Sequence, residues 1–389
     1  MMTGILGHVP ILKTAPGKVA MIPVNAPLLD GNEGKYLADC IRSGWISSEG
    51  PFVTRFEEQF AARAERRFGV AVSNGSAALE VAVAALELGP GDEVILPTFT
   101  IISCAAAIVR AGAIPIVVDC DPRTWNITAE AIEAALTPRT RAIMVVHVYG
   151  LPVDMEPVLA LTERYQLKII EDAAEAHGQT YRGRPCGSFG DISTFSFYAN
   201  KHLTTGEGGM VVTNDEALAK RCRSLRNLCF QQGKRFVHEE LGWNFRFTNL
   251  QAALGLAQLE RLDEFTARKR RMGARYYELL SDLSELQLPL AKTSYAENTY
   301  WVYGAVLDDA VPFDANAAMR RLGELGVGTR PFFWPMHEQP VFRRFGLFQG
   351  ATLPVAERIA RRGFYIPSGL GVTDGQIEQV RDAMHEIFS

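Results

Sequence analysis

FGVAVSNGSAALEVAVAALELGPGDEVILP, residues 68–97, contains two short apolar runs separated by one helical stretch. The runs at 69–72 and 93–96 have the length and composition of buried strands, and the apolar spacing over 77–88 is typical of a helix. Glycine and proline punctuate the joins. A strand, a crossover helix and a second strand in this order predict two parallel strands of one sheet.

The same alternation continues along the chain and predicts one large α/β domain. Further strands are expected at 114–118, 142–146, 168–170, 192–197 and 210–213, and further helices at 102–111, 154–165 and 215–226. The pattern then changes to a long charged helical stretch at 250–281, a strand at 301–307, a helix at 315–325 and a terminal helix. This change predicts a second, smaller domain. We therefore expect an N-terminal extension at 1–20, a large domain at 21–260 and a small domain at 261–389.

Composition excludes several classes of protein. The 389 residues include 40 Lys plus Arg against 44 Asp plus Glu, a net charge of −4, so no basic field exists to attract nucleic acid. The six cysteines show no metal-type spacing, which favours reduced thiols in the cytoplasm. No apolar run approaches the ~20 residues of a membrane helix, and residues 1–20 do not resemble a signal peptide.

The segment SNGSAAL, residues 73–79, joins a predicted strand to a predicted helix. Free N–H groups at such a helix start bind phosphate. An ordinary strand-to-helix turn with Ser76 as N-cap explains the segment equally simply. This segment alone therefore does not distinguish a phosphate site from an ordinary turn.

The segment EDAAEAHG, residues 171–178, follows a predicted strand. Asp172 lies at the carboxyl end of that strand, where open α/β sheets bind ligands, and a buried carboxylate there needs a cationic partner such as a pyridinium nitrogen. Capping of the next helix is an equally good explanation. Glu171, Glu175 and His177 do not have the spacing of a metal site, so no metal is expected.

The segment SFYANKHLTTGEGG, residues 196–209, places Lys201 in a loop after a strand. A partly desolvated lysine beside a cationic cofactor loses its proton and attacks an aldehyde. Most lysines are only surface charge. The succession of a phosphate turn, a carboxylate and a lysine at strand ends of one sheet favours a pyridoxal-phosphate site.

These three segments, with GWISSEGPFVTRFEEQFA at 44–61 and GWNFRFTNLQAALG at 242–255, resemble the DegT/DnrJ/EryC1/StrS sugar aminotransferases. The resemblance implies a fold-type I α/β enzyme, with a mainly parallel seven-stranded sheet in the large domain and a smaller C-terminal α+β domain. It also implies pyridoxal 5'-phosphate as cofactor, with the pyridoxamine form as its aminated state. L-Glutamate and a nucleotide-linked keto sugar would be the substrates, and the enzyme would be a homodimer with shared active sites.

The resemblance also assigns roles to individual residues. Lys201 would carry the cofactor covalently, and Asp172 would pair with its ring nitrogen. The remaining cofactor contacts would be Gly75, Ser76, Phe99, Glu175, Ser196 and, from the neighbouring subunit, Asn244. Aromatic and hydroxyl groups suit sugar faces, so candidates for the sugar pocket are Trp45, Ser47, Ser48, Phe333 and His337.

Two other classes stay open at this point. A nicotinamide-dependent dehydrogenase would carry G-x-G-x-x-G after its first strand, where this chain has SNGSAA. A non-catalytic regulator could keep the fold and lose the lysine, but Lys201 and Asp172 are both present.

Overall fold

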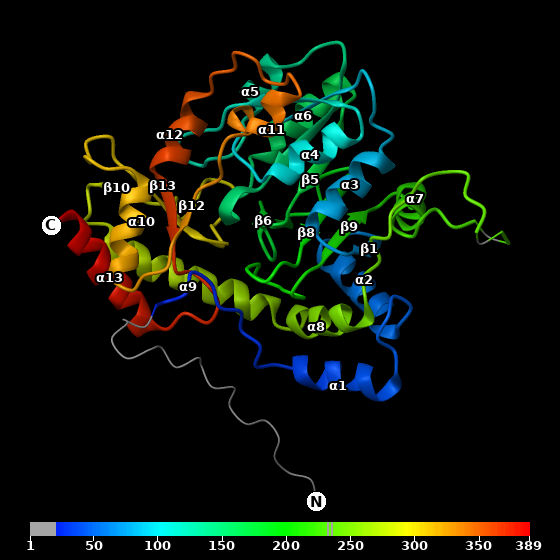
Figure 1. Cartoon of the computed structure of the whole chain (residues 1–389), viewed down its shortest axis with the longest axis horizontal. Coiled ribbons are helices and arrows are strands. Elements are labelled where there is room, and N and C mark those ends of the chain that lie inside the picture. Colours follow the sequence, from blue (N-terminus) through cyan, green and yellow to red (C-terminus); the bar gives the residue numbers. More distant parts are fainter. Residues whose placement is uncertain (1–20, 232, 235) are drawn as a thin grey trace, which may run out of the picture.

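A computed structural model gives residues 21–389 apart from 232 and 235, and its ribbon is shown in Figure 1. The extension expected at 1–20 lies outside the described residues. The helices are α1 (Glu33–Ser43), α2 (Pro51–Arg63), α3 (Gly75–Ala85), α4 (Ile102–Arg110), α5 (Ala129–Ala134), α6 (Met155–Tyr165), α7 (Glu216–Arg226), α8 (Asn249–Leu259), α9 (Leu262–Leu280), α10 (Ala315–Glu324), α11 (Pro340–Arg344), α12 (Pro354–Arg362) and α13 (Asp374–Phe388). Among the described residues, no helix combines the length and apolarity needed to cross a membrane.

A seven-stranded sheet forms the centre of the α/β part. Its strands are β1 (Phe68–Val72), β2 (Glu93–Pro97), β3 (Ile114–Val118), β4 (Thr140–Val146), β5 (Lys168–Asp172), β8 (Ile192–Ser196) and β9 (Gly209–Thr213), in the order β1-β9-β8-β5-β4-β2-β3. Neighbouring strands from β8 through β3 are parallel, and β9 is antiparallel to both of its neighbours. The predicted mainly parallel α/β fold is confirmed.

Helices cover both faces of this sheet, as Figure 1 shows for α3 and α4 on one side and α2 and α8 near the other. Alternation along β1 shows why: Val70 and Val72 enter the core that contains α3, whereas Ala71 enters the core that contains α2 and α8. All three side chains are fully buried. A sheet buried on both faces needs apolar residues on both, which explains the continuous apolar runs of the sequence.

A four-stranded antiparallel sheet follows in the C-terminal part. It consists of β10 (Leu286–Gln287), β11 (Tyr303–Leu307), β12 (Arg330–Pro331) and β13 (Gly363–Ile366), and β6 (Thr180–Tyr181) pairs with β7 (Arg184–Pro185) elsewhere. A second core unites this sheet with α9, α10 and α13, and it includes Ile22 from the start of the described chain. The proposed division at residue 260 falls between α8 and α9, and it stays a prediction.

The helical stretch expected at 250–281 is two helices. Arg261 leaves helical geometry at φ −115° and ψ 10°, although no proline or glycine marks this point. Its guanidinium pairs with Asp30 and Glu264. The ion pair with Asp30 connects the break to a distant segment, and no local breaker residue marks its position.

Candidate active site

A cavity of about 610 Å³ opens where β4, β5 and β8 end and α3 begins. This is the sheet edge at which open α/β folds bind ligands. The three segments singled out in the sequence meet there. The predicted site residues that line the cavity are Gly75, Ser76, Asp172, Glu175, Ser196, Lys201 and Phe333.

The start of α3 forms one wall of the cavity. The Asn74 side chain caps the helix by accepting from the Ala77 N–H at 2.8 Å, which leaves the N–H groups of Gly75 and Ser76 without an intrahelical partner. A Cβ atom on Gly75 would lie 2.7 Å from Cβ of Ser196, so only glycine fits between these two segments. The wall therefore offers backbone donors at a helix N-terminus, as an anionic phosphate requires.

Asp172 supplies a buried carboxylate at the end of β5. Its Oδ1 accepts from the Ala174 N–H at 3.0 Å, and its Oδ2 accepts from the thiol of Cys104 at 3.3 Å. Burial raises the pKa of Asp172, and these hydrogen bonds together with the Lys201 charge only partly oppose that rise. A thiol is a weak donor, so Oδ2 is available for a stronger, cationic partner.

Lys201 and Glu175 face each other inside the cavity. Their Nζ and Oε1 atoms lie 3.6 Å apart, and the other oxygen of Glu175 accepts from the Tyr149 N–H at 2.9 Å. Burial lowers the pKa of Lys201, and burial raises that of Glu175 to about 7 despite the nearby ammonium group. The pKa of the amine and that of the carboxyl are thus shifted toward each other by the same burial.

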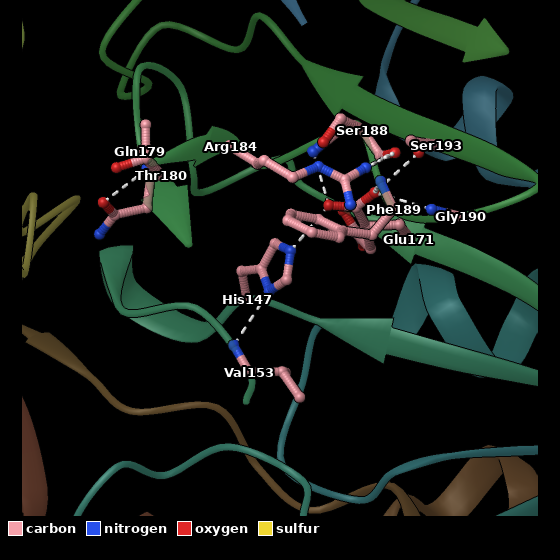
Figure 2. A network of polar contacts seen from close by, with 12 residues as sticks. His147, Val153, Glu171, Gln179, Thr180, Arg184, Ser188, Phe189, Gly190 and Ser193 are labelled. Atoms are coloured by element: carbon pink, nitrogen blue, oxygen red, sulfur yellow. Dashed lines mark hydrogen bonds and ion pairs between the residues drawn. The ribbon is translucent and has the colours of Figure 1, made fainter. Parts of the chain in front are cut away.

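Glu171, one residue before Asp172, belongs to a different network, which Figure 2 shows from close by. It accepts from His147 Nε2 at 2.9 Å and from the N–H groups of Gly187, Phe189 and Gly190. Burial alone would raise its pKa, but these hydrogen bonds lower it to about 2.

The same network contains three residues that could form a metal site. The Val153 N–H donates to His147 Nδ1 at 3.1 Å, so the imidazole carries its proton on Nε2 and donates it to Glu171. His147, Glu171 and Cys186 lie close enough to hold an ion. Because the carboxylate is already occupied by hydrogen-bond donors, the arrangement is explained as a structural network that supports the end of β5.

Phe99 and His337 are buried close to the cavity but, within the described part of the chain, are not among its lining residues. The Phe99 ring lies 5.8 Å from that of Tyr149, nearly perpendicular to it, and 5.9 Å from that of Phe333. His337 bonds Thr98 through Nδ1 at 2.8 Å. The cofactor contact of Phe99 and the sugar contact of His337 stay predictions.

The remaining predicted residues lie at the surface of the single chain. Trp45 is 51% exposed, and Ser47 and Ser48 follow it before α2. Asn244 lies in a short bridge with Asn227 and accepts from Arg246 Nε at 2.8 Å. Their proposed contacts stay predictions.

Several cavity residues were not singled out from the sequence. Tyr365 reaches the cavity from β13 and Trp301 from the segment just before β11, and Ser103 from α4 bonds the hydroxyl of Ser76 at 2.6 Å. Trp301 falls in an apolar run that predicts only a strand. Nothing local distinguishes these residues, because their proximity comes from the packing of the two sheets.

The residues present fit pyridoxal phosphate. Helix N–H groups beside Gly75 suit the phosphate, the buried Asp172 suits a protonated ring nitrogen, and Lys201, whose pKa is lowered by burial, suits an aldehyde. The three groups come from separate segments of one cavity wall. This chemistry differs from that of a nicotinamide site, which needs neither a buried lysine nor a carboxylate for a pyridinium proton.

Comparison with known proteins agrees with this geometry. The model of the DegT/DnrJ/EryC1/StrS aminotransferase family matches residues 27–385. A GDP-perosamine synthase of Caulobacter vibrioides is 42% identical over 94% of this chain and 98% of its own length. A GDP-perosamine synthase of Vibrio cholerae is 38% identical over 95% of this chain and 100% of its own length. The crystal structure of an aminotransferase from Psychrobacter cryohalolentis superposes with a TM-score of 0.87 at 31% identity, covering 94% of this chain and 99% of that chain.

Proposed function

The chain belongs to the DegT/DnrJ/EryC1/StrS aminotransferase family, and from this membership we propose that it makes GDP-perosamine by transferring the amino group of L-glutamate to a GDP-linked sugar. The acceptor in this proposal is GDP-4-keto-6-deoxy-D-mannose. The chain is a pyridoxal-phosphate-dependent sugar aminotransferase. The observation that carries the finer proposal is its 38–42% identity to three GDP-perosamine synthases over 94–95% of this chain.

Each polar residue of the cavity has a separate role in such a reaction. Bound pyridoxal phosphate supplies a reactive aldehyde and an electron-withdrawing ring. The start of α3 at Gly75 and Ser76 binds its phosphate, and Asp172 keeps its ring nitrogen protonated. Lys201 Nζ would move the proton of glutamate Cα to the cofactor and, in the second half of the reaction, a proton from the cofactor to C4 of the sugar. Glu175, whose Oε1 lies 3.6 Å from this amine, would favour its protonated form during these transfers.

Aromatic rings support a sugar as the second substrate. Phe333, Tyr365 and Trp301 line the cavity, and the Tyr149 hydroxyl accepts from the Phe333 N–H at 3.2 Å. Flat apolar rings pack well against the C–H faces of a hexose and exclude water from the reacting atoms.

We place this enzyme in the cytoplasm as a homodimer. The six cysteines are free and buried, which suits a reducing compartment. Trp45 and Ile46 are 51% and 49% exposed, and Leu241, close to Asn244 in the chain, is 94% exposed. Large apolar side chains exposed in this way are typical of an interface. In this proposal a second copy covers them and Asn244 completes the site of the neighbouring subunit.

The test is a panel of nucleotide-linked 4-keto-6-deoxyhexoses assayed with L-glutamate. We expect kcat/KM to be highest for GDP-4-keto-6-deoxy-D-mannose, with perosamine identified by mass and by its NMR couplings. Faster turnover of a dTDP- or UDP-linked sugar would replace this substrate and keep the aminotransferase. The loss of cofactor absorbance on adding glutamate alone tests the donor separately.

A further inference from the structure

The amine of Lys201 lies between two groups from different parts of the fold. On one side is Glu175 Oε1 at 3.6 Å. On the other is the indole of Trp301, whose ring centroid is 3.6 Å from Nζ. This places the amine over an aromatic face inside a buried site, where attraction between an ammonium group and a ring is strongest.

Trp301 is held in this position at several points. Its Nε1 donates to the carbonyl of Asn200 at 2.9 Å, so the indole is tied to the residue next to Lys201. Its backbone N lies so close to Gly150 that a Cβ atom there would approach it to 2.6 Å. Gly150 also has a φ of +98°, which favours glycine. The ring is therefore tied to the lysine loop, and the backbone of Trp301 packs closely against the loop after β4.

A second buried lysine anchors the backbone of Trp301. Lys269 on α9 is 2% exposed, and its Nζ donates to the carbonyl of Trp301 at 3.0 Å and to that of Ser368. Burial lowers the pKa of Lys269 to about 7. Because its amine donates to both carbonyls, Lys269 holds the backbone at Trp301 and at Ser368 against α9.

We propose that Trp301 is a positioning residue for Lys201, that its indole face and the Glu175 carboxylate together hold the amine whenever it is not bonded to the cofactor, and that Lys269 keeps the indole in place. The lysine must leave and return to the cofactor in each half of the reaction. An amine held at one place keeps its reacting geometry, whereas a freely rotating one loses it. The proposal rests on Lys201 as the cofactor lysine.

The ring and the carboxylate also bias the charge of the amine. Both favour the ammonium form, and burial opposes it, so removal of the indole face should lower the pKa of Lys201. The other titratable groups nearby are Asp172, Cys104, His177 and His202. Glu207, Tyr198 and Tyr365 complete the cavity wall. None of these groups is itself replaced in the variants at position 301.

The experiment measures the amine directly in protein loaded with pyridoxamine phosphate, which cannot bond to Lys201. Brief acetylation at a series of pH values, followed by mass spectrometry of the Lys201 peptide, gives the pH midpoint of labelling. Exposed Lys220 in the same protein serves as the internal standard. The variants are Trp301→Leu, Trp301→Phe and Lys269→Met, with Trp334→Leu and exposed Lys35→Met as matched controls.

We expect Trp301→Leu to lower the midpoint by about one pH unit. Trp301→Phe should shift it less, because a smaller ring remains, and Lys269→Met should shift it in the same direction. Both controls should match the wild type, and kcat should fall in Trp301→Leu while KM for glutamate is kept.

An unchanged midpoint in Trp301→Leu overturns the proposal. If that variant does not fold, Trp301→Phe decides by the same criterion. The labelling uses no sugar substrate. A negative labelling result would therefore overturn the role of Trp301 without bearing on the proposed substrate.

Discussion

Glu171 and Asp172 are adjacent at the end of β5, yet their carboxylates belong to opposite sides of the sheet. Glu171 accepts from His147 at 2.9 Å within a buried hydrogen-bond network, whereas Asp172 lines the cavity and accepts from the weak donor Cys104. The alternation of side chains along a strand separates them. The anionic form of Glu171 is stabilised by hydrogen bonds within the fold, whereas Asp172 has room for a cationic partner.

The pH dependence of stability should therefore differ between these neighbours. Glu171 has its pKa lowered from 4.5 to about 2, so its contribution is present above pH 4.5 and is lost as the pH falls toward 2. Glu171→Gln should cost about 3 kcal/mol at pH 7. The difference in unfolding free energy between this variant and the wild type should become smaller below pH 4.5. Urea unfolding of the cofactor-free protein at several pH values measures both effects.

Asp172→Asn is the matched control for that experiment. Burial raises the pKa of Asp172, so its ionised form opposes folding as the pH rises above 3.8. The asparagine variant should be as stable as the wild type or more stable at pH 7 when no cofactor is bound. Equal losses of stability in the two variants would contradict the separation of the two carboxylates.

The same Asp172→Asn variant should be slow in catalysis. An amide cannot keep a ring nitrogen protonated, so we expect the chemical step to slow by about a hundredfold or more. Cofactor binding should weaken far less, because the phosphate contacts at α3 remain. Single-turnover kinetics with glutamate and a cofactor titration measure the two quantities; wild-type single-turnover rates would refute the role of Asp172.

Lys201→Ala should lower transamination by about a thousandfold or more, since no other residue supplies its amine. The variant should still fold and bind pyridoxamine phosphate. Lys201→Arg should not restore activity, because a guanidinium group stays protonated. Exposed Lys220→Ala is the control. Product formation is followed by mass spectrometry, and substantial turnover in the alanine variant would reject Lys201 as the catalytic lysine.

Gly75→Ala should weaken cofactor binding by about tenfold or more, because its Cβ atom would meet Ser196 at 2.7 Å and push apart the two segments of the phosphate site. Gly323→Ala on α10 is the control, since a Cβ atom there has no neighbour within 4 Å. Fluorescence titration with pyridoxal phosphate compares the affinities. Wild-type affinity in Gly75→Ala would remove this segment from the phosphate site.

Mixing subunits tests the shared active site. If Asn244 acts across a twofold interface, a dimer of one Lys201→Ala and one Asn244→Ala subunit contains one site with both defects and one with neither. Activity should partly return after subunit exchange, measured against each variant alone. Exchange proven by native mass spectrometry without recovered activity would place Asn244 outside the neighbouring site.

Local signals account for what was predicted correctly. The alternation over 68–97 predicted β1, α3 and β2, because a buried parallel strand and a crossover helix each have their own apolar period. The cavity residues Gly75, Asp172 and Lys201 were found because each follows or precedes a strand end, and such ends meet at one edge of a sheet. The early helices α1 and α2 were not predicted, although Gly44 after α1 and Pro51 at the start of α2 are local helix signals. The reversal of β9 was not predicted because it depends on pairing between distant segments.

The sequence by itself determined the fold class, the family and the three segments that meet at the cavity, because these depend on periodicity and on short runs of residues. Only the tertiary structure decided that Trp301 reaches Lys201, that Lys269 supports Trp301, and that Glu175 faces the amine while Glu171 binds His147. The physical reason is distance along the chain. The Trp301 indole bonds a carbonyl 101 residues away, and no local pattern records a contact that forms only when two sheets pack together.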